Sequence, residues 1–352
     1  MNNNTGNGLL RHPMTFFFVS TLMASVLLVL MAGNKGSPND LCGSLRGFGS
    51  GAEGAWGPHD FRCFYRAGVL LRKGESLDLY DSARYPQHLP FIRAPWQALE
   101  FAPFTFLRLR PAFLLWLVIM ALFLAASVWR LRRPMRQVIQ GPSLPRLLAL
   151  ALLPIPGAYM FLWGQDTAVF LFFLVCGLEA VRDGRDLDAG IWLGLASIDL
   201  HFLLPVFALL MLRRRWRILQ SALAMGSVLF LTSTAVAGPH WLAACFHAQQ
   251  QATGLETGAL TVRALLWQAG LGRLQIPILL GGILASFWLV RRLPTHRACA
   301  WLVVSALAFN WHSLIYDYVA ALPAAAAADP RRPSIPPCTA TAKPSLPTEA
   351  EC

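Results

Sequence analysis

Long apolar runs recur through the chain, and several of them end in a cluster of arginines. A run of about 20 apolar residues is long enough to cross the hydrocarbon core of a bilayer as a helix. Such runs include 14–33, 111–130 and 218–237. Because a backbone exposed to lipid must satisfy its own hydrogen bonds, these runs predict membrane-spanning helices. We therefore expect an all-α, polytopic membrane protein.

Composition and charge agree with this class. The 352 residues are 55% hydrophobic and 14% charged, whereas a typical soluble domain is about 25% charged. The net charge of +12 comes from bases in short clusters between the apolar runs, as expected where cytoplasmic Lys and Arg orient a membrane protein. The aromatic stacking motifs of an RNA-binding protein are missing, so the expected partners are membrane lipids and not nucleic acid.

Further spans are predicted at 147–162, 167–181, 274–290 and 298–311. The longest connection between spans is 34–110, and the arginine clusters predict that it is an outer loop. Its last part, "QALEFAPFTFLRLRP", combines aromatic residues with arginines and suits a helix lying in the membrane interface. The first outer loop is therefore expected to carry interfacial helices.

The apolar stretch 189–212 has basic residues on both flanks and carries Asp199 and His201 near its middle. A single span would put one basic flank on the wrong side of the membrane. Two half-length helices that meet at "SIDLHFLLP" would keep both flanks cytoplasmic, and we expect this broken pair; one long span is the alternative. Irregular backbone at membrane depth must be buried in protein or line a wet cavity, and ionisable groups there suggest function.

The chain is expected to form one transmembrane domain over residues 1–328. We interpret the first span, Met14–Gly33, as a retained helix, since no clear cleavage site follows it. The tail 329–352 is rich in proline and lacks periodicity, so disorder is expected there.

Asp60 is the strongest catalytic candidate in the outer loop. Phe61, Phe64, Tyr65 and Gly68 follow it with the spacing of one helical face. Asp60 stands at the head of this helix, where it can serve as an N-cap. It is also placed to take a proton from a hydroxyl at the mouth of an apolar groove.

Several arginines make the same loop basic, among them Arg62, Arg66 and Arg93. Attraction to anionic lipid surfaces would explain them. A phosphate-binding site is the alternative, because arginine can bind phosphate through two hydrogen bonds.

Two further segments carry candidate residues. Gln165 and Asp166 form a tight turn between spans, where they can either satisfy turn backbone groups or bind a polar ligand. His312 and Tyr316 are i, i+4 neighbours if their segment is helical. The histidine is either structural or able to relay a proton near a phosphate.

Motifs of nucleotide hydrolysis, nicotinamide chemistry and zinc proteolysis are missing from the sequence. Taken in order, four segments resemble the polyprenyl-phosphate-sugar-dependent glycosyltransferases of the C-type membrane fold. The closest resemblance is to glycosyltransferase family 87, which includes bacterial mannosyl- and arabinosyltransferases. The segments are "DFRCFYRAG" with "LYD", "GQD", "AGIWLGLASIDLHFLLP" with "RRRWR", and "HSLIYDY". One departure is Asp199, which stands where such proteins usually carry a lysine.

The resemblance implies transfer of mannose, or another hexose or pentose, from a polyprenyl-phosphate donor to a hydroxyl of a lipid or glycan acceptor. Asp60 would be the base of an inverting reaction on the periplasmic side of a bacterial inner membrane. Arg62, Arg66 or Arg93 would supply charge for the phosphate without a metal, so no cofactor is expected. Gln165, His312 and Tyr316 would line the same cavity.

Two alternatives remain open from the sequence. A multispan transporter or flippase would also use a broken helix with an intramembrane acid, although no repeated second half is visible. A catalytically inactive relative that binds lipid would fit the missing lysine and the unusual tail.

Overall fold

The computed structural model describes residues 59–85, 91–140, 154–251, 261–309, 313 and 315–327. Every regular element in this part of the chain is a helix, and the all-α prediction is confirmed. The α-helices are α3 (His59–Arg72), α4 (Pro95–Phe101), α5 (Leu109–Gln140), α7 (Pro154–Trp163), α8 (Thr167–Arg182), α9 (Asp186–Leu195), α10 (Leu200–Leu212), α11 (Trp216–Ala237), α12 (Trp241–Gln251), α13 (Val262–Gln268), α14 (Gln275–Val290), α15 (Thr295–Phe309) and α16 (Leu322–Ala327). The short 3-10 helices are η2 (Ser76–Tyr80), η3 (Ser82–Arg84), η5 (Ala102–Phe106), η6 (Ala196–Asp199), η8 (Gly272–Leu274) and η9 (Ile315–Ala321).

Four helical stretches of the described chain are long and apolar enough to cross a membrane: Leu109–Leu131, Asp186–Leu212, Trp216–Ala237 and Gly272–Val290. They support the expectation of a polytopic membrane protein, and α15 is a shorter apolar helix. The predicted first span 14–33, the beginning of the span at 147–162 and the tail 329–352 lie outside the described residues.

The stretch Asp186–Leu212 is a broken pair of helices, as the flanking charges predict. Helix α9 ends at Leu195, η6 follows, and α10 begins at Leu200. A straight helix of these 27 residues would be about 40 Å long. Instead, Arg215 Nη2, just beyond α10, lies 2.6 Å from Asp186 Oδ1 at the start of α9. The chain thus returns to the side from which it came, and the alternative of one long span is wrong.

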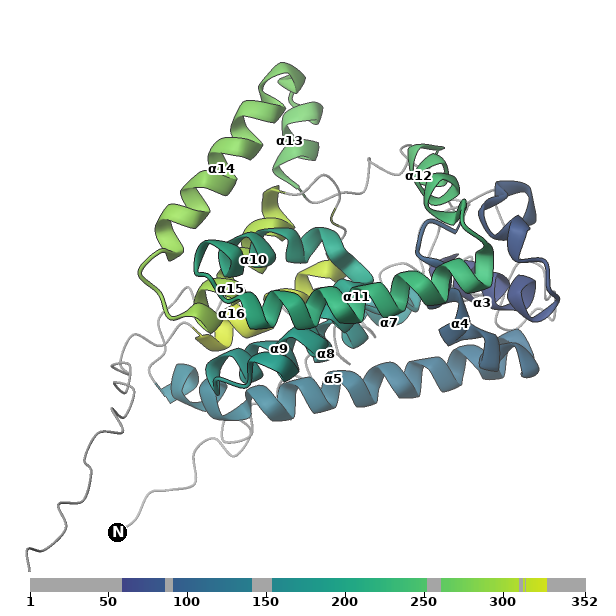
Figure 1. The fold of residues 1–352 in the computed structure, drawn as a ribbon, viewed down its shortest axis with the longest axis horizontal. Helices are drawn as coiled ribbons and strands as arrows, with labels where there is room; N and C mark the ends of the chain where they lie inside the picture. Colours follow the sequence, from purple (N-terminus) through teal and green to yellow (C-terminus); the bar gives the residue numbers. More distant parts are fainter. Residues whose placement is uncertain are drawn as a thin grey trace, which may run out of the picture.

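The arginines that follow the spans gather at one end of the bundle. Arg213, after α10, donates hydrogen bonds to Thr295 Oγ1 at 3.0 Å and to the Val290 carbonyl at 3.2 Å. At the same end, Arg130 of α5 lies 2.6 Å from Glu179 of α8. Helices α3 and α4 lie at the opposite end, to the right in Figure 1. The arginine clusters that follow the spans therefore lie at the end of the bundle away from α3 and α4.

Small residues let α9 and α11 approach closely. Gly190 and Gly194 are four residues apart on α9, in the small-xxx-small spacing common between membrane helices. A Cβ added at Gly190 would lie 2.4 Å from both the Ile218 carbonyl oxygen and Ser221 Oγ, and one at Gly194 would lie 2.7 Å from Met225 Cβ. The glycines therefore fix how α9 packs.

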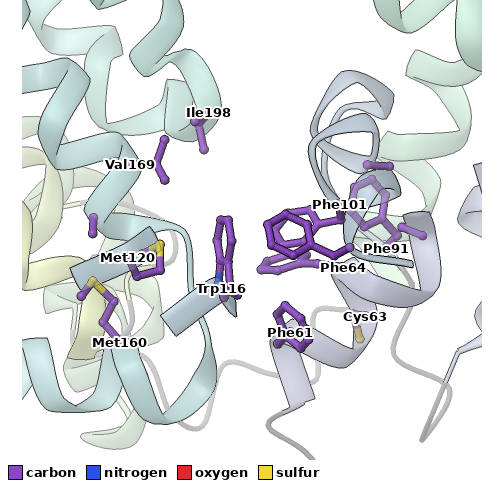
Figure 2. Packing of buried hydrophobic residues seen from close by; sticks show 14 of the residues in the cluster. Phe61, Cys63, Phe64, Phe91, Phe101, Trp116, Met120, Met160, Val169 and Ile198 are labelled. Carbon is purple, nitrogen blue, oxygen red and sulfur yellow. The ribbon is translucent and has the colours of Figure 1, made fainter. Parts of the chain in front are cut away.

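An aromatic cluster joins α3, α4 and α5 at the end opposite the arginines (Figure 2). The rings of Phe64 and Phe101 lie 4.9 Å apart, and those of Phe101 and Trp116 lie 4.7 Å apart. A Cβ at Gly68 would lie 2.8 Å from the Phe101 backbone, so only glycine admits this approach. The apolar face predicted for α3 is confirmed, with Phe61 and Phe64 buried in the cluster and Tyr65 partly buried against it.

The described part of the outer loop contains α3, α4 and the short helices η2, η3 and η5. The predicted interfacial segment forms α4 and η5, and Phe106 at its end is 77% exposed. Helix α4 is tied to the bundle where the Trp96 backbone N–H donates to Ser233 Oγ of α11 at 3.3 Å. The loop thus folds onto the ends of the long helices.

Candidate active site

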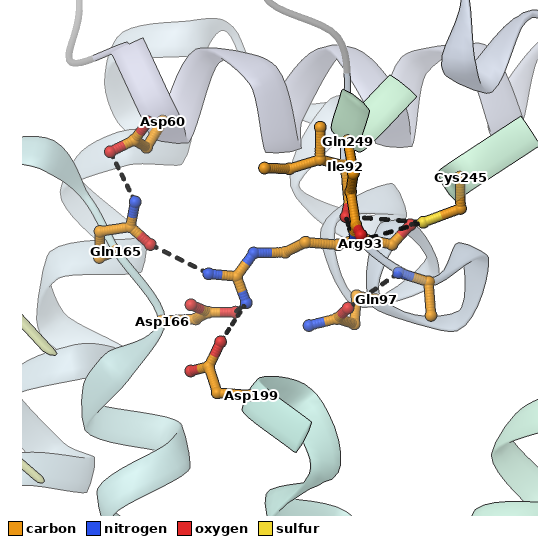
Figure 3. A network of polar contacts seen from close by, with 10 residues as sticks. Asp60, Ile92, Arg93, Gln97, Gln165, Asp166, Asp199, Cys245 and Gln249 are labelled. Carbon is orange, nitrogen blue, oxygen red and sulfur yellow. Dashed lines mark hydrogen bonds and ion pairs between the residues drawn. The ribbon is translucent and has the colours of Figure 1, made fainter. Parts of the chain in front are cut away.

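Asp60 lies in the first turn of α3, with its side chain turned towards the bundle (Figure 3). Its carboxylate Oδ2 accepts a hydrogen bond of 2.5 Å from Nε2 of Gln165. Because α3 begins at His59, Asp60 is inside the helix and is not its N-cap residue. The next side chain, Phe61, is fully buried in the aromatic cluster and so fixes the direction of Asp60.

The turn between α7 and α8 brings Gln165 to this carboxylate. Gly164 has φ of +68°, a left-handed conformation that favours glycine, and a Cβ there would lie 2.7 Å from Phe61 Cβ. The indole Nε1 of Trp116 donates to the Gly164 carbonyl at 2.8 Å. Asp166 is the N-cap residue of α8, but its side chain makes no capping hydrogen bond. The polar side chains of this turn are therefore directed at the site.

Arg93 connects three separate parts of the chain (Figure 3). Its Nη2 donates to Gln165 Oε1 at 3.2 Å, and its Nη1 lies 2.9 Å from Asp166 Oδ2 and 3.4 Å from Asp199 Oδ1. The guanidinium also lies 5.2 Å from the ring centroid of Phe64. One side chain thus joins the outer loop, the α7–α8 turn and the break between α9 and α10.

The backbone around Arg93 is held in place from two sides. Tyr80 of η2 donates its hydroxyl to the Arg93 carbonyl at 2.9 Å, and Gln249 of α12 donates to the Ile92 carbonyl at 3.1 Å. Asp81 accepts from the Ala83 backbone N–H at 2.9 Å and so shapes the loop next to Tyr80. Supporting contacts of this kind hold a site in its binding geometry, so less conformational entropy is lost when a ligand binds.

Two polar residues of α4 lie beside this network, and the sequence did not single them out. Gln97 is 3% exposed, and its Oε1 accepts from the Ala94 backbone N–H at 3.0 Å. Glu100 lies three residues further on the same face and is partly buried. The only signal in the sequence is their helical spacing within "QALE".

Burial dominates the electrostatics of three acids near the network, Asp60, Glu100 and Asp166. It raises the pKa of Asp60 to about 6, against the Gln165 hydrogen bond and the Arg93 charge, which both lower it. Burial and the Asp166 charge raise the pKa of Glu100 to about 8. Burial also raises the pKa of Asp166 to about 6, against the Arg93 charge. Asp60 is therefore ionised at neutral pH and basic enough to accept a proton in catalysis.

The predicted site residues do not all meet. Asp60, Gln165 and Arg93 belong to one network. Arg62 and Arg66 lie on the face of α3 away from Asp60, since successive residues turn by about 100°.

Arg66 Nε donates to the Arg84 carbonyl at 2.9 Å, within the outer loop. His312 lies outside the described residues, and only the backbone of Tyr316 is described, in η9. Within the described ranges no group of three or more His, Cys, Asp or Glu is placed to hold a metal ion.

One protein-family model matches a region of the chain that contains most of these site residues. The model of glycosyltransferase family 87 matches residues 91–328, which include Arg93, Gln165 and Asp199; Asp60 precedes the matched region. Neither a curated protein nor a solved structure gives a significant match to the chain. Since the match spans well over half of the chain and the helices have the length and polarity of membrane spans, this protein belongs to glycosyltransferase family 87 and is a membrane glycosyltransferase.

Proposed function

We propose that the protein transfers one sugar, mannose or another hexose or pentose, from a polyprenyl-phosphate donor to a hydroxyl of a lipid or glycan acceptor. The observation that carries this proposal is the hydrogen bond from Gln165 to Asp60, which joins a partly buried carboxylate to the arginine of the same network. A base and a cation in one site are what the displacement of a phosphate by a hydroxyl requires.

The proposed step is a single displacement with inversion. Asp60 Oδ takes the proton of the acceptor hydroxyl, and the acceptor oxygen forms a bond to the anomeric carbon of the sugar. The bond between that carbon and the phosphate oxygen breaks, and its electron pair leaves with polyprenyl phosphate. The raised pKa of Asp60, about 6, supports its role as the proton acceptor at neutral pH.

Arg93 is the arginine that we assign to the leaving phosphate. Its Nη1 is shared between two carboxylates, and its contact with Asp199 at 3.4 Å is longer than that with Asp166 at 2.9 Å. A phosphate oxygen would therefore replace Asp199 first. Arg62 and Arg66, on the other face of α3, fit phosphates of the surrounding lipid better than the leaving group. His312 and Tyr316 remain predicted ligands of the substrate.

The proposed site faces the extracytoplasmic side of a bacterial plasma membrane. The support is the separation of Asp60 from the arginine-rich end of the bundle, where Arg130, Arg213 and Arg215 lie. Positively charged ends of membrane helices stay in the cytoplasm as a rule. A lipid-linked donor would then reach the site from the outer leaflet.

The test uses membranes that contain the full-length chain and a radiolabelled donor, either polyprenyl-phosphate mannose or polyprenyl-phosphate arabinose. Transfer of label to extracted lipids and glycans is measured for the wild type and for Asp60→Asn. Loss of a general base lowers the rate about 10²–10⁴-fold, so the variant should transfer almost nothing. The matched control is Asp78→Asn, which removes another outer-loop carboxylate, one that pairs with Arg84, and should leave transfer unchanged.

Two outcomes contradict the proposal. Equal transfer by Asp60→Asn and the wild type would remove Asp60 as the base. No transfer by the wild type, together with binding of both donor lipids, would favour the catalytically inactive relative.

A further inference from the structure

Two buried polar atoms in the network have no hydrogen-bond partner within the described residues. They are Nε2 of Gln97 and Oδ1 of Asp166. The side chains are almost fully enclosed, with Gln97 3% and Asp166 1% exposed. A buried donor and a buried acceptor that both stay unpaired are unfavourable, and each calls for a missing partner.

The orientation of Gln97 is fixed by its other end. Since Oε1 accepts from the Ala94 backbone N–H at 3.0 Å, the amide nitrogen is the free group. Figure 3 shows this nitrogen on the side of Gln97 that faces the carboxylates of Asp166 and Asp199. Glu100, on the same face of α4, is close enough to Asp166 and Arg93 for their charges to act on it. This face of α4 therefore borders the network.

Hydroxyl groups of one ligand can satisfy both free atoms, because a hydroxyl both accepts and donates a hydrogen bond. One hydroxyl can accept from Gln97 Nε2 and another can donate to Asp166 Oδ1, while Asp166 Oδ2 stays on Arg93 at 2.9 Å. A phosphate or carboxylate would instead meet the charge of Asp166. We propose that Gln97, Glu100 and Asp166 form a subsite for the hydroxyl groups of a sugar ring. The assignment to a sugar rests on the proposed glycosyl transfer.

Glu100 supplies a further partner for a ring with several hydroxyls. With a pKa of about 8 it keeps its proton at neutral pH, so it donates as well as accepts a hydrogen bond. Both free atoms are covered by the protein in this structure. Trapped water would also satisfy them, so the test must separate water from sugar.

The test measures binding of sugars that carry neither lipid nor phosphate. The full-length chain in nanodiscs is mixed with methyl α-mannopyranoside, methyl α-glucopyranoside or methyl α-arabinofuranoside, and saturation-transfer NMR detects binding. At least one glycoside should bind the wild type. Binding should weaken about tenfold, the loss expected for one good hydrogen bond to a buried group, in both Gln97→Glu and Gln97→Met.

Gln97→Glu keeps an oxygen for the Ala94 backbone N–H and replaces the free donor with a carboxylate oxygen. Gln97→Met removes the donor without adding charge. The matched control is Gln275→Met on α14, another enclosed glutamine at 9% exposure that lies outside the network. It should bind the glycoside as the wild type does.

Saturation with polyprenyl-phosphate mannose shows which substrate brings the sugar. If this donor prevents glycoside binding, the subsite holds the donor sugar; if binding persists, it holds the acceptor sugar. Equal binding by the wild type and both Gln97 variants overturns the subsite, and so does a lack of binding to the wild type, which leaves water as the occupant. Loss of binding in the Gln97 variants without any transfer by the wild type keeps the subsite and overturns the proposed function.

Discussion

Gln165 donates its side-chain amide to the carboxylate of Asp60 at 2.5 Å, across 105 residues of sequence. Its carbonyl oxygen accepts from Arg93 at 3.2 Å. The amide thus bridges the proposed base and a partly buried cation, and the Gln165 hydrogen bond and the Arg93 charge both lower the pKa of Asp60 against the effect of burial. The acid, the amide and the arginine act as one electrostatic unit.

The pH dependence of sugar transfer should reflect the protonation of Asp60 within this network. With a pKa of about 6, Asp60 loses activity as it is protonated, so the rate should fall about tenfold per pH unit below this value and stay level above it. In Gln165→Leu the lost hydrogen bond should raise the pKa of Asp60, so the fall in rate should begin at a higher pH. Initial rates from about pH 5 to pH 9 measure the shift. Gln275→Leu should keep the wild-type pH profile. If the rate of Gln165→Leu falls at the same pH as that of the wild type, Gln165 does not influence the pKa of Asp60.

Removing the charge of Arg93 should destabilise the fold. Arg93→Met leaves Asp166 and Asp199 buried without their cation, and breaking a buried ion pair from one side costs about 3–5 kcal/mol. Thermal unfolding in detergent should show a lower Tm, partly recovered in Arg93→Met with Asp199→Asn. Arg84→Met breaks an exposed pair with Asp78 and should change stability by less than about 1 kcal/mol. Equal Tm values for the two single variants would refute the network's role.

The close packing of α9 on α11 predicts opposite effects on stability for two glycine-to-alanine substitutions. In Gly190→Ala the new Cβ meets the Ile218 carbonyl oxygen and Ser221 Oγ, and such overpacking costs about 1–3 kcal/mol. At Gly226 of α11 nothing lies within 4 Å of the added Cβ, so Gly226→Ala should stabilise by up to about 1 kcal/mol through helix propensity. Tm measured in the same detergent compares the two. A stabilised Gly190→Ala would mean that α9 and α11 do not pack this closely.

Stability should also depend on the protonation of Glu100. Its pKa is raised from 4.5 to about 8 in the folded protein, so the folded state holds this proton more tightly than the unfolded state. The free energy of unfolding should therefore fall as pH rises from about 4.5 to about 8. Glu100→Gln should flatten this fall and unfold at higher temperature than the wild type at alkaline pH. Glu75→Gln, in the outer loop, should keep the wild-type slope, and a steep slope in Glu100→Gln would point to another group.

The orientation in the membrane can be tested by labelling. Ala83 of η3 and Arg214 after α10 are both exposed, and they lie at opposite ends of the bundle. A membrane-impermeant maleimide applied to intact cells should label Ala83→Cys and leave Arg214→Cys unlabelled until the membrane is opened. The unsubstituted chain measures background labelling of the native cysteines. The reverse pattern would put Asp60 on the cytoplasmic side.

The sequence by itself determined the features that depend on local pattern. Apolar runs of span length predict an all-helical membrane protein, because lipid leaves the backbone few other choices. Basic flanks on both sides of 189–212 predict the break that the ion pair between Arg215 and Asp186 confirms. The spacing of Phe61, Phe64 and Gly68 likewise predicts the buried face of α3, since helical periodicity is a property of neighbours in sequence.

Only the tertiary structure decided which polar side chains meet. Arg93 reaches Gln165, Asp166 and Asp199 across 72, 73 and 106 residues, and no local pattern carries that information. The same holds for Gln97, whose free amide becomes notable only once its burial and its bond to Ala94 are known. Periodicity says which face of a helix is apolar, but the partner of a polar group depends on how distant helices pack, and that packing is set by the whole chain.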